Sequence, residues 1–377
     1  MPPPETAEST AADWLVERGS CRVVYVYDLG WQIQLSALEP RVADWKRAAP
    51  PVPRGREPQR IEIRPEPLRL EIPTDRVAVG PFLTIGPAVV KAYEFGAVSI
   101  VYTIPIRGNA EELIALSREL VDNHALLGHS RKLASDLLAR FGDTVTRGSI
   151  WSGLEDYVVF HVEEARPAIP PDQVCERFAS SFAQILRSES GPLASQEVDD
   201  AVSARISFGR DDISIFDWNA ALVIDSEVED TLAIIEFANV QLLEARFLDE
   251  QLDRSLERAY EVLSQQKRMR GWPRPTYGEG LWRVAELQIE GAVLFGRVTN
   301  ALKLIGEQYL ARVYRLLSDR FHIAEWNSGV SRKLATIESI YSKLSDRAAT
   351  RRMEILEWII IVLFVASIIV SIAFGVH

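Results

Sequence analysis

The sequence has little of the chemistry that marks secreted or disulfide-linked proteins. Its 377 residues include 2 cysteines, Cys21 and Cys175, which are too few and too far apart to form a disulfide framework. No Asn-x-Ser/Thr acceptor for glycosylation occurs. Both absences are compatible with a reducing, cytoplasmic compartment.

The first residues lack a targeting signal. Residues 1–20 contain no basic region followed by an apolar one, which excludes a secretory signal peptide. Glu5, Glu8 and Asp13 argue against a mitochondrial presequence, which would be rich in arginine and poor in acidic residues. We expect residues 1–20 to be disordered because they are polar and begin with a run of prolines.

Catalytic signatures are also missing. The sequence has no Walker loop, no G-x-G-x-x-G, no G-x-S-x-G and no H-E-x-x-H. His129 lies in a Gly-His-Ser stretch, but Lys132 stands where a nucleophile elbow needs its second glycine. His124 and His129 are five residues apart, so on one helix they diverge and make a poor metal pair. We therefore expect no enzyme and no cofactor.

Basic residues are outnumbered. The 53 acidic and 42 basic side chains give a formal net charge of -11. Binding to phosphate backbones normally needs a basic surface, so we expect no direct nucleic-acid binding.

One long apolar run is present near the C-terminus. Residues 358–376 are nineteen residues without a charge, in which Ser367 and Ser371 are polar. As a helix they would span roughly 28 Å, close to the hydrocarbon thickness of a bilayer. The pattern predicts a transmembrane tail anchor over 353–377. Its representative anchor residues are Trp358, Ile359, Phe364 and Phe374.

Basic residues precede this run. Lys343, Arg347, Arg351 and Arg352 lie just before it, and His377 follows it. Basic residues concentrate on the cytoplasmic side of membrane proteins. We therefore expect a single-pass protein whose N-terminal bulk is cytoplasmic, in the inner membrane if the source is bacterial, with membrane lipid as one partner.

The region before residue 226 mixes strand-like and helical patterns. Strand-like runs occupy 22–27, 31–35, 88–95, 97–104, 156–161, 204–208 and 213–225, with a turn at Gly96 between the third and fourth. Helical patterns cover 109–141 and 172–186. A Pro-rich segment lies at 50–67. Strands and helices without regular alternation predict an α+β domain over 21–225.

Long helices are expected over 226–352. The first runs from 230 to about 265, a hairpin turn occupies 266–280, and two further helices follow. The fold class is therefore α+β: a mixed N-terminal domain, long antiparallel coiled-coil-like helices and one transmembrane helix. Whether the apolar seams pair within one chain or between chains stays open. The predicted seam residues are Val284, Leu287, Leu294, Val298, Ile305, Leu334, Ile337, Tyr341 and Leu344.

The first long helix carries a row of acidic residues. No histidine stands at the spacing of a di-iron bundle, and arginines alternate with the acids as in salt-bridged helix faces. We interpret the acidic row as a polar face of the helix. Asn239 differs from the acids because it lies on an apolar stripe, where it could fix helix register. The row contains Glu236, Asn239, Glu244, Asp249, Asp253 and Glu257.

Three stretches resemble the YagE-like family, which includes the yeast protein required for meiotic nuclear division. They are Lys91-Ala-Tyr-Glu-Phe-Gly-Ala-Val-Ser-Ile-Val-Tyr102, Leu126-Leu-Gly-His-Ser-Arg-Lys-Leu133 and Ile355-Leu-Glu-Trp-Ile-Ile-Ile-Val362. Here His129 replaces the family's glutamine. The resemblance implies a membrane-anchored, oligomeric protein without known catalysis. For mitochondrial members the implied partner is the translation machinery.

These features favour a membrane-anchored scaffold or tether. We expect it to form a homo-oligomer through its helices and to bind a protein partner through the α+β domain. The first alternative is a single-span channel or transporter subunit, laid out like magnesium channels but lacking their second span and Gly-Met-Asn signature. The second is an enzyme with an unrecognised site, for which Tyr93, Glu94, His129 and Asp156 are the residues to test.

Overall fold

The computed structural model describes residues 14–47, 65–268, 289, 292, 293, 296 and 308–374. The chain forms two compact units. The first contains Met1–Phe247 and Gly296–Trp326, and the second contains Leu248–Phe295 and Asn327–His377. The α+β unit therefore extends beyond the expected boundary at residue 225 and takes in a later segment of the chain.

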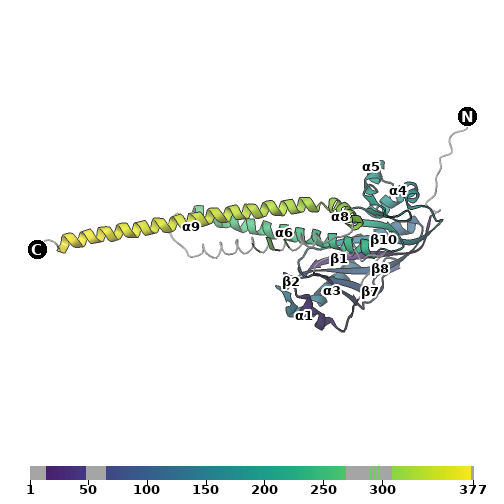
Figure 1. Cartoon of the computed structure of the whole chain (residues 1–377), viewed down its shortest axis with the longest axis horizontal. Coiled ribbons are helices and arrows are strands. Elements are labelled where there is room, and N and C mark those ends of the chain that lie inside the picture. Colours follow the sequence, from purple (N-terminus) through teal and green to yellow (C-terminus); the bar gives the residue numbers. More distant parts are fainter. Residues whose placement is uncertain are drawn as a thin grey trace, which may run out of the picture. The chain divides into compact units, whose positions relative to one another are not determined.

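A mixed β-sheet forms the centre of the first unit (Figure 1). Among the described residues nine strands share it, in the order β11-β12-β13-β10-β1-β8-β7-β4-β3. β10 and β13 are parallel, and the other neighbours are antiparallel. The strands are β1 (Leu15–Asp28), β3 (Lys46–Arg47), β4 (Leu68–Ile72), β7 (Ile85–Ala92), β8 (Ala97–Gly108), β10 (Glu155–Arg166), β11 (Arg205–Ile206), β12 (Ile213–Phe216) and β13 (Ala220–Ile224). This arrangement confirms the expected α+β class.

Smaller elements surround the sheet. Two short pairs are β2 (Gln32–Ile33) with β9 (Val145–Thr146), and β5 (Ala78–Val79) with β6 (Phe82–Leu83). Short helices are α1 (Leu35–Leu38), η2 (Glu39–Val42), η3 (Gly142–Thr144) and α5 (Ser195–Ala201).

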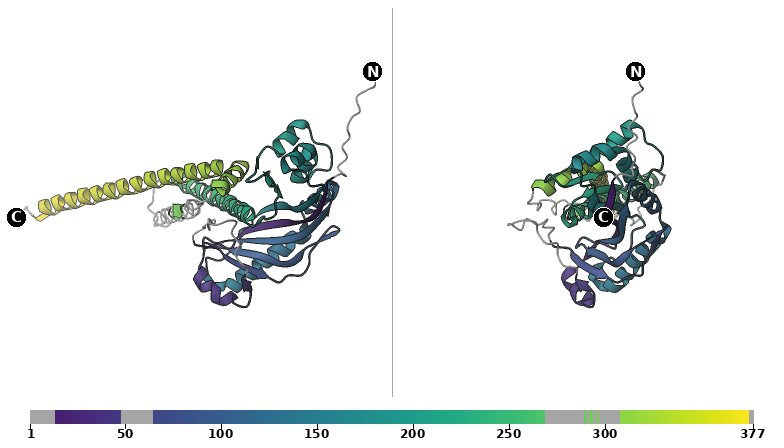
Figure 2. Two further views of the ribbon diagram at one scale, coloured as in Figure 1. Left: turned by 45° about the vertical axis from the view of Figure 1, so that its right-hand side comes forward. Right: turned by 90° about the vertical axis from the view of Figure 1, so that its right-hand side faces the viewer.

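The central strands are buried on both faces, so helices cover the sheet on each side. Side chains alternate between faces along a strand, and two pairs of contacts identify the sides. Tyr27 of β1 and Tyr102 of β8 meet α3 (His124–Phe141), whereas Arg22 of β1 and Ser99 of β8 meet α6 (Glu229–Arg268). We call these the α3 face and the α6 face. Figure 2 shows the helices on either side of the sheet.

The α3 face holds the main apolar core. Besides α3 it is covered by α2 (Ala110–Leu120) and α4 (Pro171–Arg187). Trp14, just before β1, packs its ring against Phe178 and Phe182 of α4, with centroid distances of 5.9 and 5.6 Å. The burial of Trp14 extends ordered structure upstream of Cys21. The expectation of disorder over residues 1–20 is therefore wrong for 15–20, which are β1, while residues 1–13 lie outside the described part.

The helical pattern over 109–141 is two helices instead of one. α2 starts with a capping box, in which the Glu112 backbone N–H donates to the Asn109 side chain and the Asn109 backbone N–H donates to the Glu112 side chain. It ends before Asp122, which has a φ of 49°, and Asn123 then caps α3 through the backbone N–H of Leu126. Asparagine is both a good N-cap and a plausible helix residue, so periodicity alone could not place this break.

The turn between β7 and β8 is set by Gly96, as expected. Its φ is 109°, and a Cβ there would lie 1.7 Å from the carbonyl oxygen of Gly30. The strand-like run at 31–35 follows the first strand closely in sequence but does not pair with it, because β8 and β10 occupy both edges of β1. β2 pairs with β9 instead.

Long helices continue beyond the sheet. α6 starts on its face, and its residues from Leu248 onward belong to the second unit. α8 (Gln308–Arg320) returns to the first unit, where Leu310, Val313 and Leu317 are buried. α9 (Ile323–Phe374) is one helix of 52 residues that runs without a break into the apolar segment. Most of the hairpin turn expected at 266–280 and the Pro-rich residues 50–64 lie outside the described part.

Candidate functional site

The α6 face of the sheet is polar although it is buried. Near the start of α6, Glu229 lies between two arginines that project from different strands. Its carboxylate is 3.1 Å from Arg69 of β4 and 3.6 Å from Arg22 of β1. These contacts position the first turn of α6 across strands that are not neighbours in the sheet.

Two turns further along, Glu236 makes a second anchor. Its side chain is 1% exposed, and its two carboxylate oxygens accept hydrogen bonds from Lys91 Nζ and Ser99 Oγ, both at 2.6 Å. Tyr93 lies nearby, stacked on Phe95. Burial, followed by the negative charge of Glu236, raises the pKa of the Tyr93 hydroxyl well above its usual value. Glu236 is thus a fully bonded structural carboxylate.

A third group of acids lies where β1 ends and β10 begins. Asp28, Glu155 and Glu244 are all buried. Burial raises the pKa of Asp28 to about 7 and that of Glu155 to about 7, although Arg246 bonds Glu155 and opposes the second shift. Burial and the charge of Asp28 raise the pKa of Glu244 well above its usual value. In contrast to Glu229 and Glu236, Glu244 has no cationic partner among the described residues.

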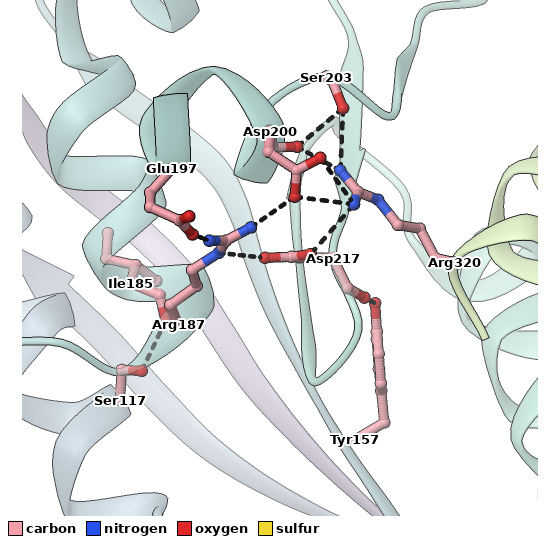
Figure 3. A network of polar contacts seen from close by, with 9 residues as sticks. All are labelled: Ser117, Tyr157, Ile185, Arg187, Glu197, Asp200, Ser203, Asp217 and Arg320. Carbon is pink, nitrogen blue, oxygen red and sulfur yellow. Dashed lines mark hydrogen bonds and ion pairs between the residues drawn. The ribbon is translucent and has the colours of Figure 1, made fainter. Parts of the chain in front are cut away.

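A separate ionic network surrounds Asp217, which follows β12 (Figure 3). Its buried carboxylate accepts a hydrogen bond from Arg187 Nε at 3.0 Å and lies 3.7 Å from Arg320. Both arginines also reach Asp200 of α5, and the Tyr157 hydroxyl donates to the Asp217 carbonyl at 2.8 Å. Burial raises the pKa of Asp217, while Arg187 opposes the shift. Glu197 and Ser203 complete the network. It joins the ends of α4 and α8 to the sheet.

The α3 face carries a smaller polar cluster. The Tyr27 hydroxyl lies 2.6 Å from Ser130 Oγ, and the Tyr102 hydroxyl lies 2.8 Å from Nδ1 of His129. The Tyr25 and Tyr102 rings meet edge to face. Burial raises the pKa of Tyr27 and of Tyr102. The hydroxyls therefore hold α3 on the sheet as neutral groups.

The four residues suggested for an unrecognised catalytic site are not brought together. His129 and Asp156 are on the α3 face, because Asp156 pairs with Tyr25 across the strands. Tyr93 lies by Glu236 of α6 instead, and Glu94 is in the turn after β7. The acidic row on α6 is likewise divided between the two units after Phe247. The part of the chain that the structure describes has no group of three or more His, Cys, Asp or Glu placed to hold a metal ion.

Comparison with known proteins places the sheet in a family. A family model described as "Uncharacterized protein MJ0711, N-terminal domain" matches residues 18–231, more than half of the chain. The chain belongs to this family. The uncharacterized protein MJ0711 of Methanocaldococcus jannaschii is 23% identical over 222 residues, which are 58% of this chain and 66% of that protein. No solved structure matches the chain.

The MJ0711 N-terminal domain covers the strands of the central sheet, apart from the first three residues of β1, and ends within the first turn of α6. An uncharacterised family was expected, and this is confirmed. The YagE-like resemblance rests on the three sequence stretches and stays a prediction. Within the domain, sequence reasoning missed Asp28, Glu155 and Asp217. Each lies at a strand end, where acidic residues are common in turns and give no distinctive signal.

The remaining expected site residues lie outside the MJ0711 N-terminal domain. In α9, Ile337 is buried and Leu334 is partly buried, whereas the side chains of Tyr341, Leu344, Arg347, Arg351, Arg352 and Phe374 are outside the described part. Lys343 is exposed. Val284, Leu287, Leu294, Val298 and Ile305 are also outside it. The seam therefore stays a prediction.

Two contacts join α6 and α9 inside the second unit. Lys333 Nζ lies 2.6 Å from Asp249 and 2.7 Å from Asp253. Asn239, expected to set helix register, instead donates to the Ile235 carbonyl of its own helix at 2.9 Å.

Part of α9 has the length and composition of a membrane span. Met353–Ser371 has a mean hydropathy of 2.5, and none of it is buried. Trp358, Ile359 and Phe364 are exposed by 67%, 49% and 69%. In the described residues one helix meets this criterion.

Proposed function

We propose that the protein is a membrane-anchored scaffold or tether that does not catalyse a reaction. In this proposal Met353–Ser371 holds the chain in a bilayer and the sheet domain binds a protein partner. The long helices assemble copies of the chain. Membership in a family of uncharacterised proteins is compatible with this role and adds no activity to it.

The exposed apolar segment of α9 carries the proposal. Nineteen helical residues span roughly 28 Å, which matches the hydrocarbon core of a bilayer. Large exposed apolar patches mark surfaces that another apolar phase covers. All of the segment's backbone groups are bonded within the helix, as a lipid environment requires. Lipid is therefore its natural surrounding.

The orientation follows from the basic residues before the segment. Lys343, Arg347, Arg351 and Arg352 precede it, and we propose that they face the cytoplasm together with the sheet domain. Trp358 would lie at the interface, where amphipathic rings concentrate.

The absence of catalysis is proposed from what the buried polar groups do. Glu229 and Glu236 hold α6, Tyr27 and Tyr102 hold α3, and the Asp217 network holds α4 and α8. Perturbed pKa values often indicate catalytic sites, but structural ion networks perturb them too.

Membrane fractionation tests the anchor. We expect the full chain to float with membranes and to resist extraction by alkaline carbonate. An Ile360→Arg/Leu363→Arg variant should move to the soluble fraction, since each charge at the centre of a span costs about 3 kcal/mol. The matched control is Ser339→Arg/Ser342→Arg, which adds the same charges at exposed positions of α9 before the segment. Equal extraction of both variants would overturn the proposal.

The assembly is tested separately. Native mass measurement in mild detergent should find more than one copy of the chain, together with a co-purifying protein. A monomer without a partner would leave the anchor standing and remove the scaffold role.

A further inference from the structure

α6 presents three acidic side chains to the sheet, and the third differs from the others. Glu229 and Glu236 each meet a cation, as described above. Glu244 is 1% exposed, and neither of its carboxylate oxygens has a hydrogen-bond partner in the described structure. An ionised carboxylate in this position would be highly unfavourable, because nothing replaces the water it has lost.

Geometry places Glu244 close to the end of β1. Arg246, two residues after Glu244 on α6, bonds Glu155, and Glu155 pairs with Val26, two residues before Asp28. Asp28 is the last residue of β1 and is 3% exposed, and alternation along β1 places it on the α6 face with Arg22. The backbone N–H of Gly30 donates to its carboxylate. The two acids thus come from the strand and from the helix that covers it.

The surrounding charged groups do not neutralise the carboxylates of Asp28 and Glu244. β10 contributes Glu155, whose carboxylate is bonded by Arg246 of α6. Ala97 of β8 pairs with Asp28 and carries no charge. On β7, Lys91 is bonded to Glu236. The nearby cations are therefore committed to other acids.

We propose that Asp28 and Glu244 share one proton, and that this proton keeps the middle of α6 on the sheet. One proton on the pair removes one of its two negative charges, and with it the repulsion between the two groups. Two buried carboxylates in one site do not ionise together, and the proton belongs to the pair. This inference does not depend on membrane anchoring.

The proposal makes α6 sensitive to pH, and its sign can be worked out. Burial raises the pKa of Asp28 to about 7 in the folded chain and raises that of Glu244, so the folded state holds a proton that the unfolded state releases near pH 4. Stability is then highest at low pH and falls as pH rises from about 4 through about 7.

Hydrogen exchange of the full chain in detergent tests this. The opening equilibrium of amides in residues 236–247, corrected for intrinsic exchange, should rise about tenfold per pH unit between pH 5 and 6.5. Glu244→Gln should remove most of this slope, because an amide cannot ionise. Asp28→Asn should do the same and serves if Glu244→Gln does not fold. Glu250→Gln, on the same helix and paired with Arg254, should keep the wild-type profile.

Two results would overturn the proposal. One is an unchanged pH slope in both Glu244→Gln and Asp28→Asn. The other is full protection of α6 at pH 8 on adding Mg²⁺, lost in Glu244→Gln, which would make the pair a cation site. Infrared difference spectra give an independent check: a protonated carboxyl band present at pH 5.5 should be absent in Glu244→Gln.

Discussion

At the scale of single residues, charged side chains of the sheet form ion pairs that hold helices on it. Lys91, Arg22 and Arg69 project from three strands to the same helix. A buried pair of this kind adds little net stability compared with apolar packing, but it is costly to break. A buried ion pair favours one register of the helix on the sheet. A purely apolar face would specify that register less strongly.

The Lys91–Glu236 pair gives the first prediction. Glu236→Leu should lower the free energy of unfolding by about 3 kcal/mol, because it leaves the Lys91 ammonium without its partner. The double variant Lys91→Met/Glu236→Leu should recover much of this loss. Urea unfolding followed by tryptophan fluorescence measures both. A double variant less stable than Glu236→Leu would contradict the argument.

The Asp217 network gives the second prediction. Asp217→Asn should lower the free energy of unfolding by about 3 kcal/mol, since Arg187 and Arg320 lose a fully buried counter-charge. The control is Asp143→Asn, which removes an exposed carboxylate paired with Arg41 and should change stability by less than about 1 kcal/mol. Thermal unfolding of the two variants should separate them clearly; equal midpoints would show that the network is not structurally important.

At the scale of elements, residue patterns within short segments predicted several strands, one turn and one helix correctly. The runs at 88–95 and 97–104, the turn at Gly96 and the helix near 172–186 all correspond to observed elements. Partners were harder to predict, because residues 31–35 have strand character but the edges of β1 are occupied by strands far away in sequence. The candidate site was not predictable for the same reason: Asp28 and Glu244 are separated by more than two hundred residues.

Two glycines give a contrasting third prediction. Gly96→Ala should destabilise the protein by about 1–3 kcal/mol from backbone strain alone, and the close approach of Gly30 adds to this. Gly128 lies inside α3 with open space around its Cα, so Gly128→Ala should stabilise by up to about 1 kcal/mol. Both effects are measured by thermal unfolding. A destabilised Gly128→Ala would mean that α3 packs more tightly there than the structure shows.

At the scale of the whole molecule, the first unit is built from two separate segments of the chain. α8 supplies Leu310, Val313 and Leu317 to its core and Arg320 to the Asp217 network. The sequence suggested one boundary at residue 225, because composition changes there. Composition does not reveal that α8 packs in the first unit, because an amphipathic helix has the same residue pattern whichever unit it packs in.

This organisation gives the fourth prediction. A chain that ends after residue 326 should retain a cooperative unfolding transition of the sheet domain. A chain that ends after residue 268 should lose it or unfold at a much lower temperature, because α8 and its buried side chains are missing. Circular dichroism during heating compares the two. A stable 268-residue chain would show that α8 is dispensable.

The return of α8 also affects how the protein is made. Roughly sixty residues separate Phe247 from Leu310, and at about 5–20 residues per second the ribosome needs roughly 3–12 s to synthesise them. During that interval the surface that α8 and Phe321 later cover, on β12 and around Tyr157, is open to other chains and to chaperones. Ribosome-bound chains halted before residue 308 should therefore be cleaved by protease near this surface, and chains halted well beyond Arg320 should resist.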